Sequence, residues 1–225
     1  MTEQARPNRK QMVLYGCISV FIATLIITSV TASKLWSLTI PVIGYVIIVP
    51  VGTTLFALTF LATDTIAEVW GKAYSIAIVW LGLFMRLLAL AFFAFAVWLE
   101  PVYFWTDQEA YASTLGGSLR IIIAGVIAYL ISQLNDVFVF HYFKTRDQGK
   151  NLLWKRNNIS TFSSQFLDSF IFVIIAFGGV MTAAQLISTI IGQVLFKWLI
   201  AIIDTPFLYM LRNFATNRKL FDFSG

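Results

Sequence analysis

The chain has 225 residues, of which 59% are hydrophobic and 12% charged, whereas a soluble domain carries roughly a quarter charged residues. This composition excludes an ordinary soluble protein and predicts an integral membrane protein, with 21 Phe and 7 Trp suited to lipid-facing surfaces and interfacial belts. The net charge of +5 comes from basic residues at expected membrane edges, so we expect no nucleic-acid partner. The single cysteine excludes a disulfide framework and a Cys-based metal site.

Runs of about 20 apolar residues span a bilayer, and six such runs occur in what we interpret as one transmembrane domain over residues 1–225. We expect helices at about 12–32, 51–70, 74–99, 119–141, 158–179 and 185–211. The first run is too long for a signal peptide and lacks a cleavage pattern, so we expect it to be retained. Six spans place both termini on the same side of the membrane.

Lysine and arginine are distributed unevenly over the expected loops. Cytoplasmic loops are enriched in these residues, and cytoplasmic termini place the following inside: Arg6, Arg9, Lys10, Lys72, Lys144, Arg146, Lys150, Lys155, Arg156, Arg212, Arg218 and Lys219. Outside remain Lys34 and Arg120, beside an acidic loop with Glu100, Asp107 and Glu109. The sequence therefore predicts an all-α, multi-pass protein of the plasma membrane (the cell inner membrane) with both termini cytoplasmic.

The segment from Thr39 to Pro50 differs from a plain helix. It is rich in β-branched residues, contains Pro41 and Pro50, and is interrupted at Gly44, which are hairpin signals. We expect a short β-hairpin on the outer side between the first two helices, packed on protein because unpaired backbone cannot face lipid. The alternative is a longer second helix kinked by proline.

Two acids lie one helical turn apart at the end of the second expected span, Asp64 and Glu68. Residues i and i+4 share a helix face. A carboxylate inside a bilayer costs at least roughly 2.5 kcal/mol, so it normally faces the protein interior or a wet cavity. For Glu68, a solvated position at the cytoplasmic interface is the alternative.

Polar residues follow helical spacing in several spans. They are Ser132, Gln133 and Asp136 in the fourth; Thr161, Ser164, Gln165 and Asp168 in the fifth; Thr189, Gln193, Lys197 and Asp204 in the sixth; Arg86 in the third; and Thr24, Thr28 and Thr31 in the first. The fourth and fifth spans also share a weak internal similarity, 132–140 (SQLNDVFVF) with 164–172 (SQFLDSFIF). These stripes predict a central polar cavity.

The expected cavity has more acids than bases. Buried unpaired carboxylates either take up protons or await a ligand rich in hydrogen-bond donors. The amides of Gln133, Asn135 and Gln165 could match another edge of such a ligand. The rings of Phe138, Phe170 and Trp70 could stack on it, with ordinary packing as the alternative. For Lys197 the alternatives are ligand contact and an ion pair with an acid on another helix; Arg86 and Asp204 fit pairing roles better.

Nothing in the sequence supports an enzyme, a metal site or a cofactor. His141 is the single histidine and lies at a helix end, so a His-rich metal site is excluded. Gly-x-Ser-x-Gly, His-Glu-x-x-His and phosphate-cradling glycine loops do not occur.

Several motifs together resemble the vitamin uptake transporter family, the queuosine precursor transporters. They are 60–64 (FLATD) followed by Trp70 and Gly71, 132–140 (SQLNDVFVF), 160–168 (STFSSQFLD) with Ala176 and Phe177, and Phe196-Lys197 leading to Thr205-Pro206. The resemblance implies a six-helix inner-membrane protein that imports 7-deazaguanine bases for queuosine synthesis in tRNA. It places Asp64, Gln133, Asp136, Asp168 and Lys197 at the family's polar positions.

The leading hypothesis is therefore a transporter of a queuosine precursor, with protons as a candidate second partner; oligomeric state, a homo-oligomer included, is left open. We expect the substrate to contact Asp64, Gln133, Asn135, Asp136, Gln165, Asp168 and Lys197, with Glu68, Trp70, Arg86, Gln193 and Phe138 as secondary candidates. The alternative is the substrate-binding component of an energy-coupling factor vitamin importer. A membrane enzyme is the third hypothesis, and it lacks any nucleophile, base or metal set.

Overall fold

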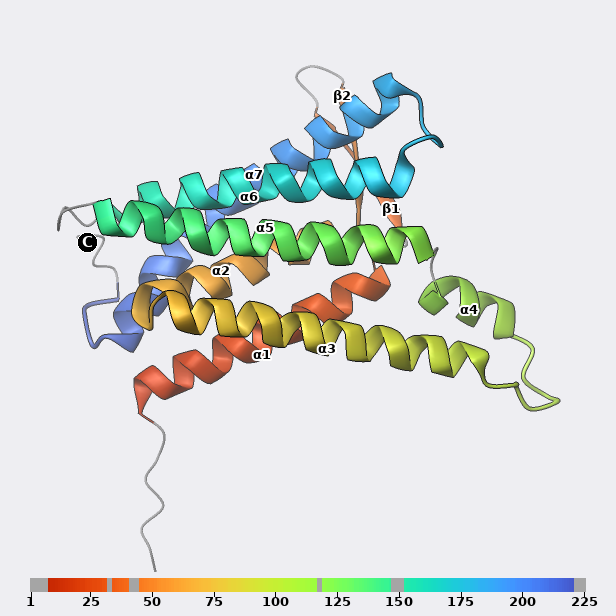
Figure 1. Ribbon diagram of the computed structural model, residues 1–225, viewed down its shortest axis with the longest axis horizontal. Helices are drawn as coiled ribbons and strands as arrows, with labels where there is room; N and C mark the ends of the chain where they lie inside the picture. Colours follow the sequence, from red (N-terminus) through yellow and green to blue (C-terminus); the bar gives the residue numbers. More distant parts are fainter. Residues whose placement is uncertain (1–7, 32–33, 41–44, 117–118, 147–151, 221–225) are drawn as a thin grey trace, which may run out of the picture.

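The computed structural model describes residues 8–31, 34–40, 45–116, 119–146 and 152–220. It is a bundle of long helices that carries a two-stranded sheet (Figure 1). The elements are α1 (Arg9–Thr31), β1 (Leu35–Ile40), β2 (Tyr45–Pro50), α2 (Thr53–Val69), α3 (Lys72–Trp98), α4 (Gln108–Gly116), α5 (Leu119–Arg146), α6 (Leu153–Phe177) and α7 (Ala183–Ala215).

Most of these helices have the length and composition of membrane spans. Within the described residues, α1, α3, α6, α7 and the run Gln108–Arg146 that contains α5 are long and apolar enough to cross a bilayer. The second expected span corresponds to α2, which has 17 residues and therefore a length of about 25 Å at 1.5 Å per residue. It packs against α1, α3, α5 and α7, so it lies inside the bundle rather than at its lipid-facing surface. The chain is thus a helical membrane protein.

Three helices extend well beyond the apolar runs that predicted them, whereas α2 is slightly shorter than its expected run of 51–70. The α5 helix continues past His141 to Arg146, α6 begins at Leu153 rather than near residue 158, and α7 continues to Ala215. Charged residues at these ends limit the apolar run but are compatible with helical hydrogen bonding. The apolar run therefore marks the part of a helix that lies in the membrane core, and for α5, α6 and α7 it underestimates the length of the whole helix.

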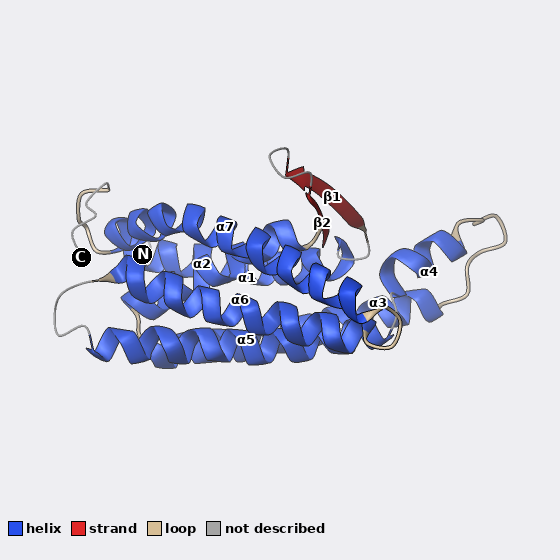
Figure 2. Ribbon diagram, turned by 90° about the horizontal axis from the view of Figure 1, so that it is seen from above, coloured by secondary structure: helices blue, strands red, loops and turns tan. Residues whose placement is uncertain are grey.

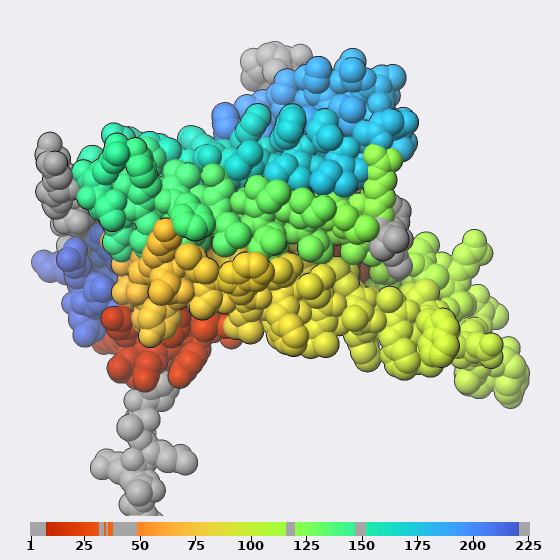
Figure 3. Space-filling model, viewed as in Figure 1, coloured from red at the N-terminus to blue at the C-terminus, as the bar shows by residue number. Residues whose placement is uncertain are grey.

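The connection between α3 and α5 contains a helix that the sequence analysis did not predict, α4. Its Gln, Glu, Ala and Leu residues favour helix, and the Tyr111 amide donates to the Asp107 carbonyl in its first turn. The Gln108 side chain also donates to the Val97 carbonyl at the end of α3. Figure 3 shows α4 extending beyond the end of the helix bundle.

Basic residues gather at one end of the bundle. The Arg9 guanidinium donates to the Asn217 side chain at 3.3 Å and lies over the Phe214 ring, so the start of α1 and the end of α7 share this end. Lys144 from α5 reaches the last turn of α2. This basic end agrees with the expected charge distribution; Arg6 and Lys150 lie outside the described residues.

The two strands occupy the place between α1 and α2 where a hairpin was expected. They pair antiparallel with Leu35 opposite Pro50 and Ile40 opposite Tyr45, and the turn residues 41–44 lie outside the described residues. Trp36 makes an edge contact with the Phe196 ring of α7 at 5.8 Å between centroids. Figure 2 shows the strands beside the bundle, in the half toward α4. The α2 helix begins only at Thr53, so it is not the longer proline-kinked helix of the alternative.

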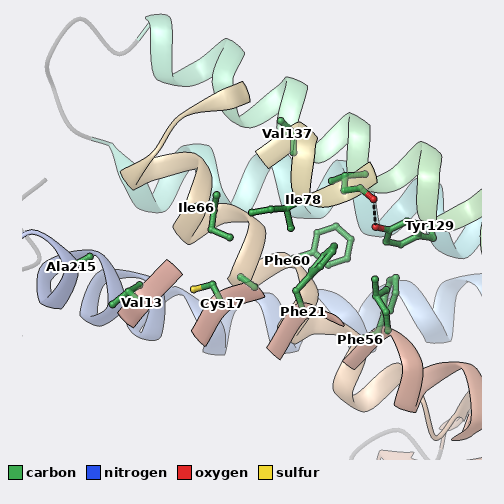
Figure 4. Close-up of a cluster of buried hydrophobic side chains, with 13 residues drawn as sticks. Val13, Cys17, Phe21, Phe56, Phe60, Ile66, Ile78, Tyr129, Val137 and Ala215 are labelled. Carbon is green, nitrogen blue, oxygen red and sulfur yellow. Dashed lines mark hydrogen bonds between the residues drawn. The ribbon is translucent and has the colours of Figure 1, made fainter. Parts of the chain in front are cut away.

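A buried apolar cluster joins α1, α2, α3, α5 and the end of α7 (Figure 4). On α1, the residues Val13, Cys17, Phe21 and Leu25 recur every four positions and are buried, which places them on one helix face. The Tyr129 hydroxyl of α5 donates to the Val79 carbonyl of α3 at 2.8 Å, the dashed line in Figure 4. The phenol is thus buried without losing its hydrogen bond.

Gly82 allows α3 to approach this cluster closely. A Cβ atom at Gly82 would come within 3.0 Å of the side chains of Phe21, Tyr129 and Leu25. Such contacts are shorter than van der Waals distances, so a methyl group there requires the helices to separate.

We therefore predict that Gly82→Ala destabilises the protein, because overpacking a core typically costs about 1–3 kcal/mol. The matched control is Gly16→Ala on α1, where a Cβ would meet no atom within 4 Å. Thermal unfolding in detergent, followed by tryptophan fluorescence, should give a lower Tm for Gly82→Ala and an unchanged or higher Tm for Gly16→Ala. Equal Tm values for the two variants would contradict the close packing described.

Candidate substrate site

Helices α5 and α6 carry the same short motif and bind each other through it. In α5 Ser132 precedes Asp136 by four residues, and in α6 Ser164 precedes Asp168 by four. The Ser132 hydroxyl donates to Asp168 Oδ1 at 3.3 Å, and the Ser164 hydroxyl donates to Asp136 Oδ1 at 3.0 Å. Because the helices are antiparallel neighbours, the repeated spacing produces a reciprocal pair of contacts. The internal similarity seen in the sequence therefore corresponds to a local two-fold arrangement.

Asp168 is also paired with the buried lysine of α7. Lys197 Nζ lies 2.5 Å from Asp168 Oδ2, and both side chains are at least nine-tenths buried. The ammonium group also lies 5.5 Å from the centre of the Phe56 ring of α2. An unpaired buried charge is costly, so this pair holds α6 against α7 at a fixed level of the bundle.

This ion pair lines a cavity, called here the outer cavity, in the half of the bundle next to the hairpin. Its volume is about 70 Å³, several times the roughly 10–15 Å³ that one water molecule requires on the same measure. The lining residues come from α1, α2, α3, α5, α6 and α7, from the end of β2 and from Gly52 before α2: Thr28, Pro50, Gly52, Thr53, Phe56, Arg86, Gly125, Asp168, Phe172, Gln193 and Lys197. The space suits a small molecule with both polar and flat apolar surfaces.

Two further polar groups face this cavity. Arg86 of α3 donates to the Gly125 carbonyl of α5 at 3.0 Å. A Cβ at residue 125 would lie 2.7 Å from the guanidinium, so a side chain there would require the end of the Arg86 side chain to move. Gln193 of α7 is 2% exposed, and its Nε2 has no hydrogen-bond partner among the described residues. A buried donor without a partner is costly and is what a ligand carbonyl or ring nitrogen would satisfy.

Asp64 and Asp136 lie outside this cavity, on the side toward the basic end. The Thr161 hydroxyl of α6 donates to Asp64 Oδ2 at 3.3 Å, one turn of α6 away from the Ser164 contact with Asp136. The two carboxyl groups are within hydrogen-bonding reach of each other. Asp64 also lines a second space of about 10 Å³, the size of one water, with Asn157, Thr161 and Asp204.

The predicted amides have different environments. Gln133 is fully buried and bonded to α2, donating to the Thr59 hydroxyl at 3.0 Å and accepting from Thr63 at 3.4 Å. Asn135 donates to the Ser163 hydroxyl between α5 and α6. Gln165 is buried with neither amide atom hydrogen-bonded within the described residues. Gln133 and Asn135 are thus occupied by helix packing, whereas Gln165 has its hydrogen-bonding capacity unused.

Three secondary candidates lie at the basic end, away from the outer cavity. Glu68 forms ion pairs with Arg156 at 2.6 Å and Lys144 at 3.0 Å, so it links α2, α5 and α6 rather than standing solvated. Lys10 lies over the Trp70 ring. Phe138 is 49% exposed and lies under Lys72 at 3.9 Å. The structure does not bring Trp70 or Phe138 together with the buried acids, and Phe170, 45% exposed, stacks on Phe166.

Six residues of the cavity were not identified as site residues from the sequence: Pro50, Gly52, Thr53, Phe56, Gly125 and Phe172. Phe172 follows Asp168 by one helical turn, so helical spacing could have pointed to it. Phe56 and Gly125 carry no local signal in a chain with 21 Phe and 13 Gly.

Comparison with known proteins agrees with this membrane architecture. Residues 50–211 match the family described as "Putative vitamin uptake transporter", which covers most of the chain. The chain belongs to this vitamin uptake transporter family. A relative from Bacillus subtilis (strain 168), the "Probable queuosine precursor transporter", is 33% identical over 167 residues, 74% of this chain and 72% of the relative. No solved structure matches the chain.

Membership of the vitamin uptake transporter family makes this chain a transporter rather than an enzyme. Its apolar helices place it as a multi-pass protein of the plasma membrane. The matched region begins at Pro50 and ends at Leu211, so it contains α2 to α6 and most of α7. It therefore includes every acid and base of the candidate site.

The Asp168 and Lys197 pair predicts a specific pattern of stabilities. Asp168→Asn or Lys197→Met alone leaves one buried charge without its partner, which typically costs about 3–5 kcal/mol. The double variant removes both charges and should recover much of the loss. Thermal unfolding of the three variants in one detergent checks this pattern, and a double variant at least as unstable as the sum of the single ones would contradict direct pairing.

Proposed function

We propose that this chain imports a queuosine precursor, a 7-deazaguanine base in the cyano or aminomethyl form, for tRNA modification. The observation that carries the proposal is the outer cavity, where a carboxylate, an ammonium, a guanidinium and an unpaired amide face one small space. The relative named as a queuosine precursor transporter supports the choice of substrate.

The groups of the cavity complement the edges of a deazaguanine. One edge of such a base presents a ring N–H beside an amino group, and a carboxylate accepts from both side by side. Asp168 is the acid that lines the cavity. Sharing this carboxylate between Lys197 and the base keeps each charge compensated.

The opposite edge of the base needs donors. Its carbonyl and ring nitrogen are acceptors, and the unpaired Nε2 of Gln193 and the guanidinium of Arg86 are donors on the cavity wall. The rings of Phe56 and Phe172 also line it and offer faces on which a bicyclic base can stack.

The position of the cavity supports import. With the basic end of the bundle in the cytoplasm, six helices cross the membrane, α2 among them, and both termini lie inside. The cavity, beside Pro50, Gly52 and Thr53, then lies in the outer half, where a substrate from outside arrives first. A larger groove between α1, α2 and α7 is lined by apolar side chains such as Met12, Val20 and Leu58, so it suits lipid chains rather than a polar base.

The test is uptake of radiolabelled 7-cyano-7-deazaguanine by cells that lack their own transporter and express this chain alone. Wild type should take up the base, and excess guanine or biotin should compete less well than unlabelled precursor. Uptake that requires separate ATPase subunits would instead identify a substrate-binding component of an energy-coupling factor importer.

We predict that Gln193→Leu lowers uptake about tenfold or more, because losing a buried hydrogen bond to the base costs roughly 1–3 kcal/mol and 1.4 kcal/mol is a factor of ten. The matched control is Gln11→Leu, an exposed amide near the basic end, which should retain uptake. If Gln193→Leu takes up the base at the wild-type rate, at equal expression in the membrane, the outer cavity is not the site that binds the substrate.

A further inference from the structure

We infer that Asp64 and Asp136 form a proton-binding site that is separate from the outer cavity, and that the proton held there is carried inward with the base. This inference rests on the proposed function. It assigns to two of the buried acids a ligand, a proton, that differs from the one bound by Asp168.

The two carboxyl groups are buried and close together. Asp64 is 2% exposed and Asp136 is fully buried, and they lie within hydrogen-bonding reach of each other. Two carboxylates are both acceptors, so a hydrogen bond between them requires one proton. The pair thus has the geometry of two acids that share a proton.

The surrounding hydrogen bonds leave room for that proton. Asp136 Oδ1 accepts from Ser164 at 3.0 Å, whereas Asp136 Oδ2 is buried and has no donor within the described part of the chain. Asp64 accepts from Thr161 at 3.3 Å. A carboxylic O–H on Asp64 would supply the donor that Asp136 lacks.

No described cation neutralises the pair. Lys197 is bound to Asp168, while Arg156 and Lys144 are bound to Glu68. A buried pair of carboxylates without a cation is strongly disfavoured unless it takes up a proton. The buried and partly buried ionisable groups on the surrounding helices include Glu68 on α2, Arg86 on α3, Tyr129, His141 and Lys144 on α5, Arg156 and Asp168 on α6, Lys197, Asp204, Tyr209 and Arg212 on α7, and Cys17 on α1.

The position of the pair connects it to both ends of the bundle. On the outer side, Asp136 lies one helical turn from Ser132, which donates to Asp168 at the cavity. Toward the basic end, Asp64 shares a water-sized space with Asp204 of α7. A change in the charge of the pair can therefore act on the Ser132 and Asp168 contact, and Asp204 offers a route by which a proton leaves.

The experiment uses the full chain in proteoliposomes, with 7-cyano-7-deazaguanine as the probe. Wild type should accumulate the base when the outside is made acidic, and an uncoupler should abolish the accumulation. Asp136→Asn and Asp64→Asn should still exchange labelled for unlabelled base at equal pH, while accumulation driven by the pH gradient falls at least tenfold. The control Asp107→Asn, exposed in the connection before α4, should accumulate like wild type.

The outcomes separate this inference from the proposed function. If the wild type exchanges the base but its accumulation does not respond to the pH gradient, or responds to a sodium gradient instead, the proton site is overturned. The proposed function is then unaffected. Loss of exchange in Asp136→Asn makes this acid a contact of the base and overturns the inference. Absence of binding and exchange by the wild type overturns the function itself.

A second measurement tests the proton directly without a substrate. Infrared spectra of the purified protein should contain the carbonyl stretch of a protonated, buried carboxylic acid. This band should disappear in the Asp64→Asn and Asp136→Asn double variant and persist in Asp107→Asn. A spectrum identical in the double variant and the wild type would show that the pair holds no proton.

Discussion

Lys197 and Asp168 lie 2.5 Å apart inside a bundle of mostly apolar helices, and the other polar residues of the interior lie around this pair. Each charge is stable there because the other is present. Asp168 in turn accepts from Ser132, so one carboxylate contacts α5 and α7 from its position on α6. A substrate that enters the outer cavity meets a charge pair that is already fixed by three helices.

Four acids of the interior, Asp64, Glu68, Asp136 and Asp168, fall into three groups with different surroundings. Asp168 has a cation and faces the outer cavity; Asp64 and Asp136 have each other and hydroxyl donors; Glu68 has Arg156 and Lys144 at the basic end. From the hairpin toward the basic end of the bundle, these groups follow one another in that order.

The sequence was sufficient to predict the membrane helices and the polar stripes because both depend on local spacing. Apolar runs gave five helices that are long enough to cross a bilayer, and steps of three and four residues placed Asp136 and Asp168 on facing sides of neighbouring helices. The one shared chamber expected for Asp64, Asp136 and Asp168 is instead divided, with only Asp168 at the outer cavity. That division depends on the depth at which helices cross, which helical periodicity does not determine.

Other features depend on contacts that are distant in sequence. Gly125 matters because Arg86, 39 residues earlier, donates to its carbonyl, and Glu68 is held by cations from two other helices. Trp70 and Phe138 share residue type with the rings of the cavity but lie under lysines at the basic end. In a chain with 21 Phe, residue type alone does not distinguish a cavity wall from a surface.

The central claim is that the base and the proton occupy separate sites. An experimental structure of the full chain in lipid nanodiscs with 7-cyano-7-deazaguanine tests it most directly. The account predicts the base between Asp168, Gln193 and Arg86, with the Asp64 and Asp136 carboxyl groups still in contact with each other. Density for the base between Asp64 and Asp136, with the outer cavity empty, would contradict it.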